Sequence, residues 1–364
     1  MCEDTAGYST VVGPQWQIKR LIERWSDLRT PDRLRIERPR LLEFREVDRD
    51  TAHRFDDDWS PAIAVAYHPS GFGIPGTAQL QAELMLSEGP LPYYDRPPYA
   101  YLGPNQLLWE PGYQFQSTHQ GDANIPDHPF DAAELDQLVR SAPTVPTGSR
   151  ARGHRVAVLD TGVRAADHDM LDFIKCDNAG IRRTPAADPH GHGTAVATVI
   201  KAVQGNADIH PIRVLNEKNN GASYEVLAGL MYALWSGQYD LINASLTTNV
   251  SGPCATSVGR SIDYILRYCS AMADLPVLVA AAGNFGSGTL CGYPARLPQA
   301  VVALARDHTG ERATYNSTPL EGAVTEEAYG GSKTRPLGHL PHPATTSLWG
   351  TSFAAGAVSG AYLP

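Results

Sequence analysis

The sequence has few cysteines and few basic residues, and each shortage excludes a class of protein. Five cysteines in 364 residues are too few, and too widely spaced, for a disulfide scaffold. Lys and Arg number 30 against 39 Asp and Glu, so the formal net charge is 30 − 39 = −9. Proteins that bind the phosphate backbone need clustered basic residues, so we expect no nucleic-acid partner.

Segments that direct a chain to a membrane are also missing from the sequence. The first residues, Met1 to Thr5, show no basic region followed by an apolar one. Nowhere do about 18 uncharged apolar residues follow one another. These absences favour a cytoplasmic location without a membrane partner. Reduced, buried thiols are then the expected state of the cysteines, with a Cys254–Cys291 bridge as the exception to check.

After residue 150 the sequence alternates apolar runs with amphipathic stretches. Runs that are apolar on both faces predict strands of a parallel sheet covered by helices, and apolar residues every three or four positions predict the helices. The predicted strands are 154–159, 209–215, 240–246, 276–282 and 299–304, and the predicted helices are 194–203, 223–235 and 258–272. The expected fold class is therefore α/β, with a doubly wound, mostly parallel sheet.

The first 125 residues have a different character and predict a separate N-terminal α+β module. They include an amphipathic helix over 15–28 and a stretch dense in Pro and Tyr over 89–113. A capping box of Asp131 and Glu134 predicts a further helix, and a flexible linker over 142–150 leads into the first parallel strand. We place the domains at 1–125 and 126–364, and expect the first to inhibit the second or to recruit a partner.

The N-terminal module contains a misleading motif, since Gly71 to Gly76 matches G-x-G-x-x-G after a predicted strand over 62–67. Pro75 removes an amide that would meet a phosphate, and 91–95 is a poor second strand. A Gly/Pro loop is therefore favoured over a dinucleotide site.

Four segments of the α/β part carry a residue suited to acyl-transfer chemistry. Asp160 ends an apolar strand, where ligands of open α/β sheets bind. His192 lies between glycines that give substrate access to the ring. Ser352 lies at a predicted helix start, where backbone N–H groups stabilise a developing oxyanion. Asn284 follows a buried strand, and its side-chain amide is a second donor for that oxygen.

Taken singly, each motif has an ordinary interpretation. A strand-end aspartate often caps a turn, and Gly-Thr-Ser is a common helix N-cap. The pair His190 and His192 has a spacing that a metal site also uses. The four motifs together are far more specific than any one of them.

In chain order, Asp160, His192, Asn284 and Ser352 resemble the subtilisin-like serine peptidases, and the resemblance runs from about residue 130 to the end. The order Asp, His, Ser is characteristic of that family. The resemblance implies a serine endopeptidase that cleaves proteins or peptides through an acyl-enzyme, without a metal or organic cofactor. It also implies that His192 moves the proton of Ser352, that Asp160 orients the ring, and that Asn284 binds the oxyanion.

The same resemblance implies a groove in which the substrate adds a strand to the protein. Its implied walls are Ser245, Leu246 and Thr247 on one side, Ala282, Gly283 and Asn284 on the other, and Asn219, Asn220 and Gly221 along a further edge. Thr247 and Thr248 stand where relatives commonly have two glycines, which predicts a narrowed or redirected specificity pocket. Gly292 resembles the floor of that pocket.

Two alternatives to hydrolysis stay open, and one departure from the family pattern favours the second of them. Gly356 and Ala357 stand where relatives usually have proline and histidine, which predicts a less rigid start to the Ser352 helix. One alternative is a peptide-modifying transferase, such as a macrocyclase, in which an amine replaces water. The other is a catalytically inactive binding module.

Overall fold

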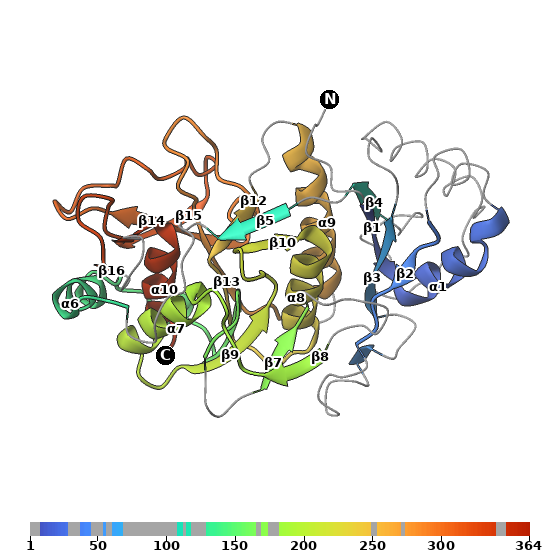
Figure 1. The fold of residues 1–364 in the computed structure, drawn as a ribbon, viewed down its shortest axis with the longest axis horizontal. Helices are drawn as coiled ribbons and strands as arrows, with labels where there is room; N and C mark the ends of the chain where they lie inside the picture. The colour runs from blue at the N-terminus through green and yellow to red at the C-terminus, as the bar shows by residue number, and fades with distance from the viewer. Residues whose placement is uncertain are drawn as a thin grey trace.

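The computed structural model describes residues 8–27, 37–44, 54–55, 60–67, 108–111, 114–117, 129–164, 169–173, 182–248, 253–270, 274–339 and 347–364. In this part of the chain, an eight-stranded sheet lies between two layers of helices, and a four-stranded sheet lies outside one of those layers (Figure 1). The predicted α/β fold with a doubly wound, mostly parallel sheet is confirmed.

The central sheet has the strand order β15-β14-β13-β11-β6-β9-β7-β8. Its strands are β6 (Arg155–Asp160), β7 (Asp169–Asp172), β8 (Arg182–Pro185), β9 (Asp208–Arg213), β11 (Leu241–Ala244), β13 (Val277–Ala281), β14 (Ala300–Arg306) and β15 (Val324–Tyr329). Neighbouring strands are parallel except β7 and β8. The chain builds outward from β6 in both directions, so the carboxyl end of β6 is a topological switch point, where open α/β sheets bind ligands.

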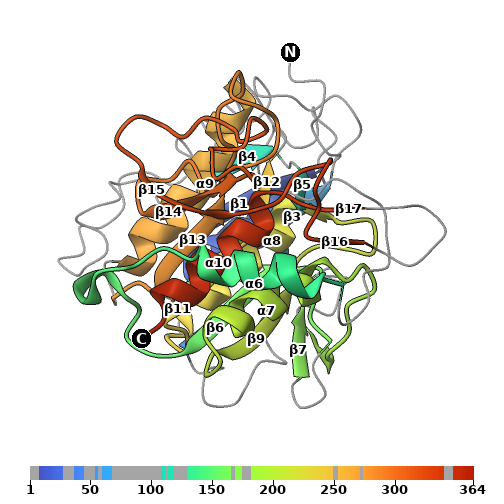
Figure 2. The same ribbon diagram turned by 90° about the vertical axis from the view of Figure 1, so that its left-hand side faces the viewer.

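Helices cover both faces of this sheet (Figures 1 and 2). One layer contains α6 (Ala132–Arg140), α7 (His192–Val203) and α10 (Thr351–Tyr362), and the other contains α8 (Ser223–Trp235) and α9 (Pro253–Ser270). Val156 and Val158 of β6 pack in the core cluster of α7 and α10, whereas Ala157 and Leu159 pack in that of α8 and α9. This strand is apolar on both faces because both faces are covered.

The predicted strands and helices of the α/β part are present with shifted ends. Helix α9 begins at Pro253, earlier than predicted, and α7 begins at His192 itself. The predicted strand over 240–246 is divided, because β11 ends at Ala244 and the next residues form β12 (Leu246–Thr248) in a different sheet.

The N-terminal residues form an antiparallel sheet of order β2-β3-β1-β4. Its elements are β1 (Tyr8–Pro14), α1 (Gln15–Glu23), β2 (Arg40–Leu41), β3 (Pro61–Tyr67) and β4 (Leu108–Pro111). Ile18 and Leu21 of α1 are buried against β1 and β3. The helix is shorter than the predicted 15–28, because a 3₁₀ turn over Trp25–Asp27 follows it.

Four aromatic rings join this N-terminal sheet to the α/β part, and we call them the aromatic cluster: Phe44, Phe55, Phe173 and Tyr232. The Phe44 and Phe55 rings stack with centroids 4.3 Å apart, and the Tyr232 ring of α8 stacks on Phe55 at 5.6 Å. The Phe173 ring meets Phe44 edge-on at 6.3 Å. A single apolar core therefore reaches from the N-terminal sheet to the central sheet. The domain boundary predicted at residues 125 and 126 lies outside the described residues.

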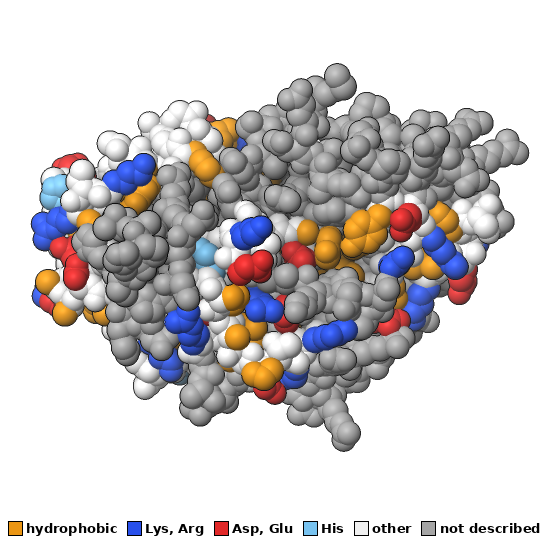
Figure 3. All heavy atoms as spheres, viewed as in Figure 1, with side chains coloured by type: hydrophobic (Ala, Val, Ile, Leu, Met, Phe, Trp, Pro, Cys, Tyr) orange, Lys and Arg blue, Asp and Glu red, His pale blue; other side chains and the backbone are white. Residues whose placement is uncertain are grey.

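Several other predictions concern the surface and the thiols. On the face in Figure 3, acidic and basic side chains of the described residues are interspersed. Within the described part of the chain, no helix combines the length and the apolar character needed to cross a membrane.

Cys291 is a free, buried thiol, so the Cys254–Cys291 bridge is not formed. The motif Gly71 to Gly76 and the segments 89–100 and 101–107 lie outside the described residues.

Candidate active site

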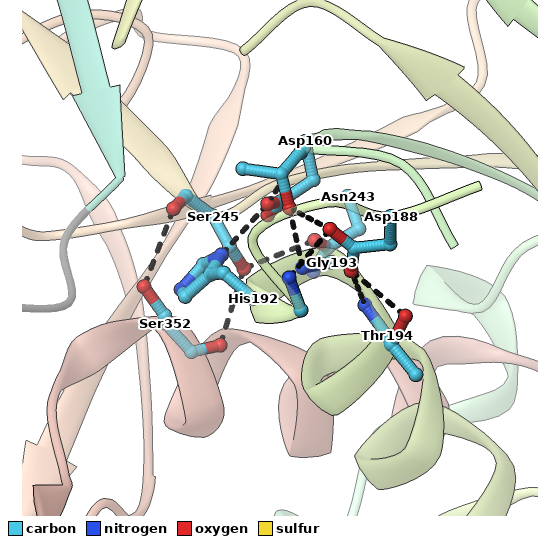
Figure 4. A network of polar contacts seen from close by, with 10 residues as sticks. Asp160, Asp188, His192, Gly193, Thr194, Asn243, Ser245 and Ser352 are labelled. Carbon is cyan, nitrogen blue, oxygen red and sulfur yellow. Dashed lines mark hydrogen bonds and ion pairs between the residues drawn. The ribbon is translucent and has the colours of Figure 1, made fainter. Parts of the chain in front are cut away.

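The aspartate that ends β6 and the histidine that begins α7 form a buried pair (Figure 4). Nδ1 of His192 lies 2.7 Å from Oδ1 of Asp160, and both side chains are fully buried, at 0% exposure. Because an ionised carboxylate only accepts hydrogen bonds, this contact favours the ring tautomer with its proton on Nδ1. The lone pair of the neutral ring is then on Nε2, which makes that nitrogen the base.

A second aspartate, Asp188, holds the start of the histidine helix and belongs to none of the predicted motifs. Its buried carboxylate accepts hydrogen bonds from the backbone N–H groups of Gly191 at 2.6 Å and Thr194 at 2.8 Å. It also accepts from the hydroxyls of Thr194 at 2.7 Å and Thr161 at 2.8 Å. Two otherwise orphaned donors at the helix start are satisfied in this way. The sequence did contain one sign of this role, since Asp188 is an acidic residue just before the start of α7.

Thr161 links this network to Asp160, the residue before it. Its hydroxyl oxygen accepts from the backbone N–H of Gly193 at 3.0 Å, and its own backbone N–H donates to Oδ1 of Asp160 at 2.7 Å. The end of β6 and the first turn of α7 are therefore joined by the contacts of Thr161 and Asp188 as well as by the Asp160–His192 pair (Figure 4).

The glycines that flank His192 have a backbone role in addition to the predicted substrate access. Gly191 has a left-handed φ of 95°, which favours glycine. A Cβ on Gly193 would lie 2.0 Å from the carbonyl oxygen of Gly162, so only glycine lets α7 approach the loop after β6.

Ser352 lies in the first turn of α10 and is fully buried. Its hydroxyl donates to the carbonyl oxygen of Ser245 at 3.2 Å, and the hydroxyl of Ser245 donates to the carbonyl oxygen of Ser352 at 3.1 Å. The next residue, Phe353, has its ring 5.9 Å from the ring of His192, so the serine and histidine helices meet at this point.

Asn284 is held by the residue before the serine. Its Oδ1 accepts from the backbone N–H and from the hydroxyl of Thr351, both at 3.0 Å. The Thr351 hydroxyl accepts in turn from the backbone N–H of Gly283 at 3.1 Å. A backbone N–H only donates, so these contacts fix the amide with its oxygen toward Thr351 and its NH₂ group turned away.

Gly356 packs the serine helix against the histidine helix, although the sequence favours a looser helix start. A Cβ on Gly356 would lie 3.1 Å from Cβ of Val199, and a Cβ on Gly360 would lie 2.6 Å from Cβ of Val203. Both valines belong to α7. The two glycines thus allow α10 and α7 to lie close together.

The edges predicted to bind a substrate strand already hold a strand of this chain (Figure 1). The strand β5 (Gln114–Ser117) lies between β10 (Asn220–Ala222) and β12 and is antiparallel to both. Gln116 is opposite Asn220 on one side and opposite Thr247 on the other.

The other residues of the predicted groove lie next to these strands. Asn219 precedes β10 with a left-handed φ of 64°, and Ser245 precedes β12. The remaining predicted residues are Gly221 in β10, Leu246 in β12, and Ala282 and Gly283 directly after β13.

His190 lies beside His192, with ring centroids 6.3 Å apart. The described residues contain no group of three or more His, Cys, Asp and Glu side chains placed to hold a metal ion.

An aspartate–histidine pair at the end of a central parallel strand, facing the first turn of a serine-bearing helix, is an arrangement found in serine hydrolases. The family model described as "Subtilase family" matches residues 151–363, and the chain belongs to this family. The resemblance to subtilisin-like peptidases found in the sequence is thereby confirmed.

Individual relatives have modest identity to this chain. Alkaline elastase YaB of Bacillus sp. (strain YaB) is 28% identical over 226 residues, which are 58% of this chain and 54% of that protein. Subtilisin amylosacchariticus of Bacillus subtilis subsp. amylosacchariticus is 28% identical over 227 residues, or 59% and 55% of the two chains. Among solved structures, sphericase has a TM-score of 0.46 and 24% identity, covering 62% of this chain and 82% of its own. The chain spans about half the length of these two curated relatives.

Proposed function

We propose that the chain is a serine endopeptidase that hydrolyses peptide bonds through an acyl-enzyme on Ser352. The observation that carries the proposal is the fully buried contact of 2.7 Å between His192 and Asp160, beside the serine helix. Because the Ser352 hydroxyl donates to the carbonyl of Ser245, its proton must turn toward Nε2 of His192 before attack. Family membership supports the same reaction.

In this mechanism His192 takes the proton of Ser352 while the serine oxygen bonds to the substrate carbonyl carbon. The carbonyl electrons move to its oxygen, and Asp160 stabilises the imidazolium. When the tetrahedral intermediate collapses, the C–N bond breaks and the leaving amine takes the proton from His192. Water then repeats these steps on the acyl-enzyme and releases the second product.

The developing oxyanion would accept hydrogen bonds from the NH₂ group of Asn284 and the backbone N–H of Ser352. The contacts from Thr351 to Asn284 support this role, because they fix which end of the amide is the donor. A single donor of this kind is worth about 10²- to 10³-fold in turnover.

Peptide hydrolysis by variants of the full chain that also carry Gln116→Pro, which is expected to free the substrate edges held by β5, tests these roles. Ser352→Ala or His192→Ala should abolish turnover, with a loss of about 10⁶-fold known for subtilisin, whereas Asn284→Ala should leave weak activity. Ser270→Ala, at an exposed serine that ends α9, is the control. Continued cleavage by Ser352→Ala would show that the nucleophile is misassigned.

Product mass distinguishes the alternative functions. Hydrolysis adds one water to the sum of the products, whereas a transferase that cyclises a peptide adds none. In the chain carrying Gln116→Pro, an inactive binding module would still give no cleavage, and a fluorophosphonate would not label Ser352.

The second part of the proposal is that the N-terminal module inhibits the peptidase instead of recruiting a partner. A substrate strand needs the same edges of β10 and β12 that β5 now pairs with, so the two exclude each other. The full burial of Ser352 and His192 agrees with an inhibited state. Protein or peptide substrates and a cytoplasmic location remain predictions.

Gln116→Pro tests inhibition with the rest of the chain in place. Proline removes the backbone N–H of the central residue that faces both edges, and it disrupts pairing within a sheet. Cleavage of a short peptide should increase in this variant, whereas Gln116→Ala, which keeps the N–H, should remain repressed. If Gln116→Pro cleaves the short peptide no faster and loses a protein target, the module recruits.

A further inference from the structure

We propose that this peptidase accepts only a small side chain, such as that of Gly, Ala or Ser, on the substrate residue whose carbonyl is attacked. Thr247 and Thr248 occupy the space that a larger side chain would need. This inference rests on the proposed function, because it concerns the substrate of the same site.

The place of this pocket follows from the contacts of the serine. The Ser352 hydroxyl donates to the carbonyl of Ser245, and Thr247 lies two residues farther along the same segment, about 7 Å away. A peptide paired with β12, with its reacting carbonyl at Ser352, would therefore direct that residue's side chain along Thr247 and Thr248. The segment 291–293 forms the wall beyond, since Thr248 and Tyr293 exchange hydrogen bonds of 3.1 Å.

Threonine atoms already fill the space in front of Gly292. A Cβ built on Gly292 would lie 2.2 Å from the hydroxyl oxygen of Thr247 and 2.9 Å from that of Thr248. It would also lie 2.4 Å from the carbonyl oxygen of Thr248. Thr247 and Thr248 are 0% and 2% exposed, so these groups form part of a packed interior. A carbon added to Gly292 has no room on the side that faces β12, so an aromatic ring entering there would have to displace the threonines.

The far wall of the pocket is itself held in place. The backbone N–H of Tyr293 donates to the hydroxyl of Thr248 at 3.1 Å. The Tyr293 ring packs so closely on α9 that a Cβ on Gly259 would lie 2.1 Å from it. The guanidinium of Arg296 lies over that ring, 5.9 Å from its centroid. A large side chain would have to displace this packed segment, so the threonines set the limit on size.

Binding of product-like peptides tests the proposal without requiring turnover. The full chain carrying Gln116→Pro and Ser352→Ala is titrated, by fluorescence anisotropy, with two labelled peptides that differ only in a C-terminal Ala or Phe. The Ala peptide should bind at least about 10-fold more tightly. Thr247→Gly should raise the affinity for the Phe peptide relative to that for the Ala peptide by about 10-fold or more. Thr247→Val, which keeps the side-chain volume, should leave the ratio unchanged.

Equal affinity of the starting chain for the two peptides would overturn the proposal, as would an unchanged ratio in Thr247→Gly. Binding of neither peptide would also count against it, because a pocket of this size must hold alanine. Thr247→Ala provides a second enlargement of the pocket if the glycine variant does not fold. Absence of hydrolysis by the chain with Ser352 intact would overturn the proposed function alone, since the binding ratio does not depend on turnover.

Discussion

Replacing Asp188 by alanine should disconnect the first turn of α7 from the end of β6. The carboxylate accepts four hydrogen bonds in a buried position, from two backbone N–H groups and two hydroxyls. A hydrogen bond to a charged group contributes about 1.5 to 3 kcal/mol. The four are coupled and the two hydroxyls can turn to other partners, so we expect a loss of about 3 to 5 kcal/mol in the free energy of unfolding.

Urea unfolding of variants built on Ser352→Ala, which prevents self-digestion, measures this loss. Asp307→Ala is the matched control, because Asp307 also accepts from a backbone N–H and a hydroxyl, those of Thr309 at 2.8 and 2.6 Å, but in an exposed turn. Asp307→Ala should lower the free energy of unfolding by less than about 1 kcal/mol. If Asp188→Ala costs no more than Asp307→Ala, the carboxylate does not hold the helix start, and our account of this network is wrong.

Three further predictions follow from buried groups. Burial raises the pKa of Glu225 to about 8, so the folded chain keeps a proton up to about pH 8 that the unfolded chain releases above about pH 4.5. Between these two pH values the stability should fall by up to about 1.4 kcal/mol per pH unit. In urea titrations at several pH values, the stability of Glu225→Gln should not show this fall. If stability falls equally with pH in the variant and in the parent chain, the prediction is wrong. In the chain carrying Gln116→Pro, Gly360→Leu should separate α10 from α7 and abolish peptide turnover. Gly205→Leu, whose side chain would enter open space, should leave turnover unchanged, and equal losses in the two variants would refute the packing argument. Burial raises the pKa of the Cys291 thiol to about 12, so mass spectrometry should find much slower alkylation by iodoacetamide in the native chain than in urea.

The α/β architecture was predictable because strands covered on both faces have a simple signature. The division between β11 and β12 had no such signature, since Leu246 continues the apolar pattern of β11 after a single serine. The direction of β12 depends on pairing with β5, a segment about 130 residues earlier in the chain. A pairing between segments so far apart cannot be predicted from the local sequence.

The residues proposed to react could be singled out in the sequence because their neighbours are distinctive, as with the glycines around His192. Asp188 was not, since two of its partners are backbone N–H groups, which every residue type except proline offers. The segment Gln114–Ser117 was missed for a similar reason, because its pairing uses the backbone edges of β10 and β12. Gly356 was interpreted through helix propensity alone, whereas its contact with Val199 depends on tertiary packing.

In the inhibited state that we propose, the strand β5 competes with substrates at a local concentration that dilution of the protein does not lower. It is part of the same chain as the edges it pairs with, and such a covalent link gives an effective concentration on the order of 1 mM. A peptide present at about 1 μM is therefore at a disadvantage of roughly a thousandfold unless it binds that much more tightly. If the chain is cut between β5 and the α/β part, the association of the two pieces becomes bimolecular. The N-terminal piece is then held only by non-covalent contacts such as those of the aromatic cluster. A single nick would thus convert a permanent occupant into one whose departure depends on protein concentration.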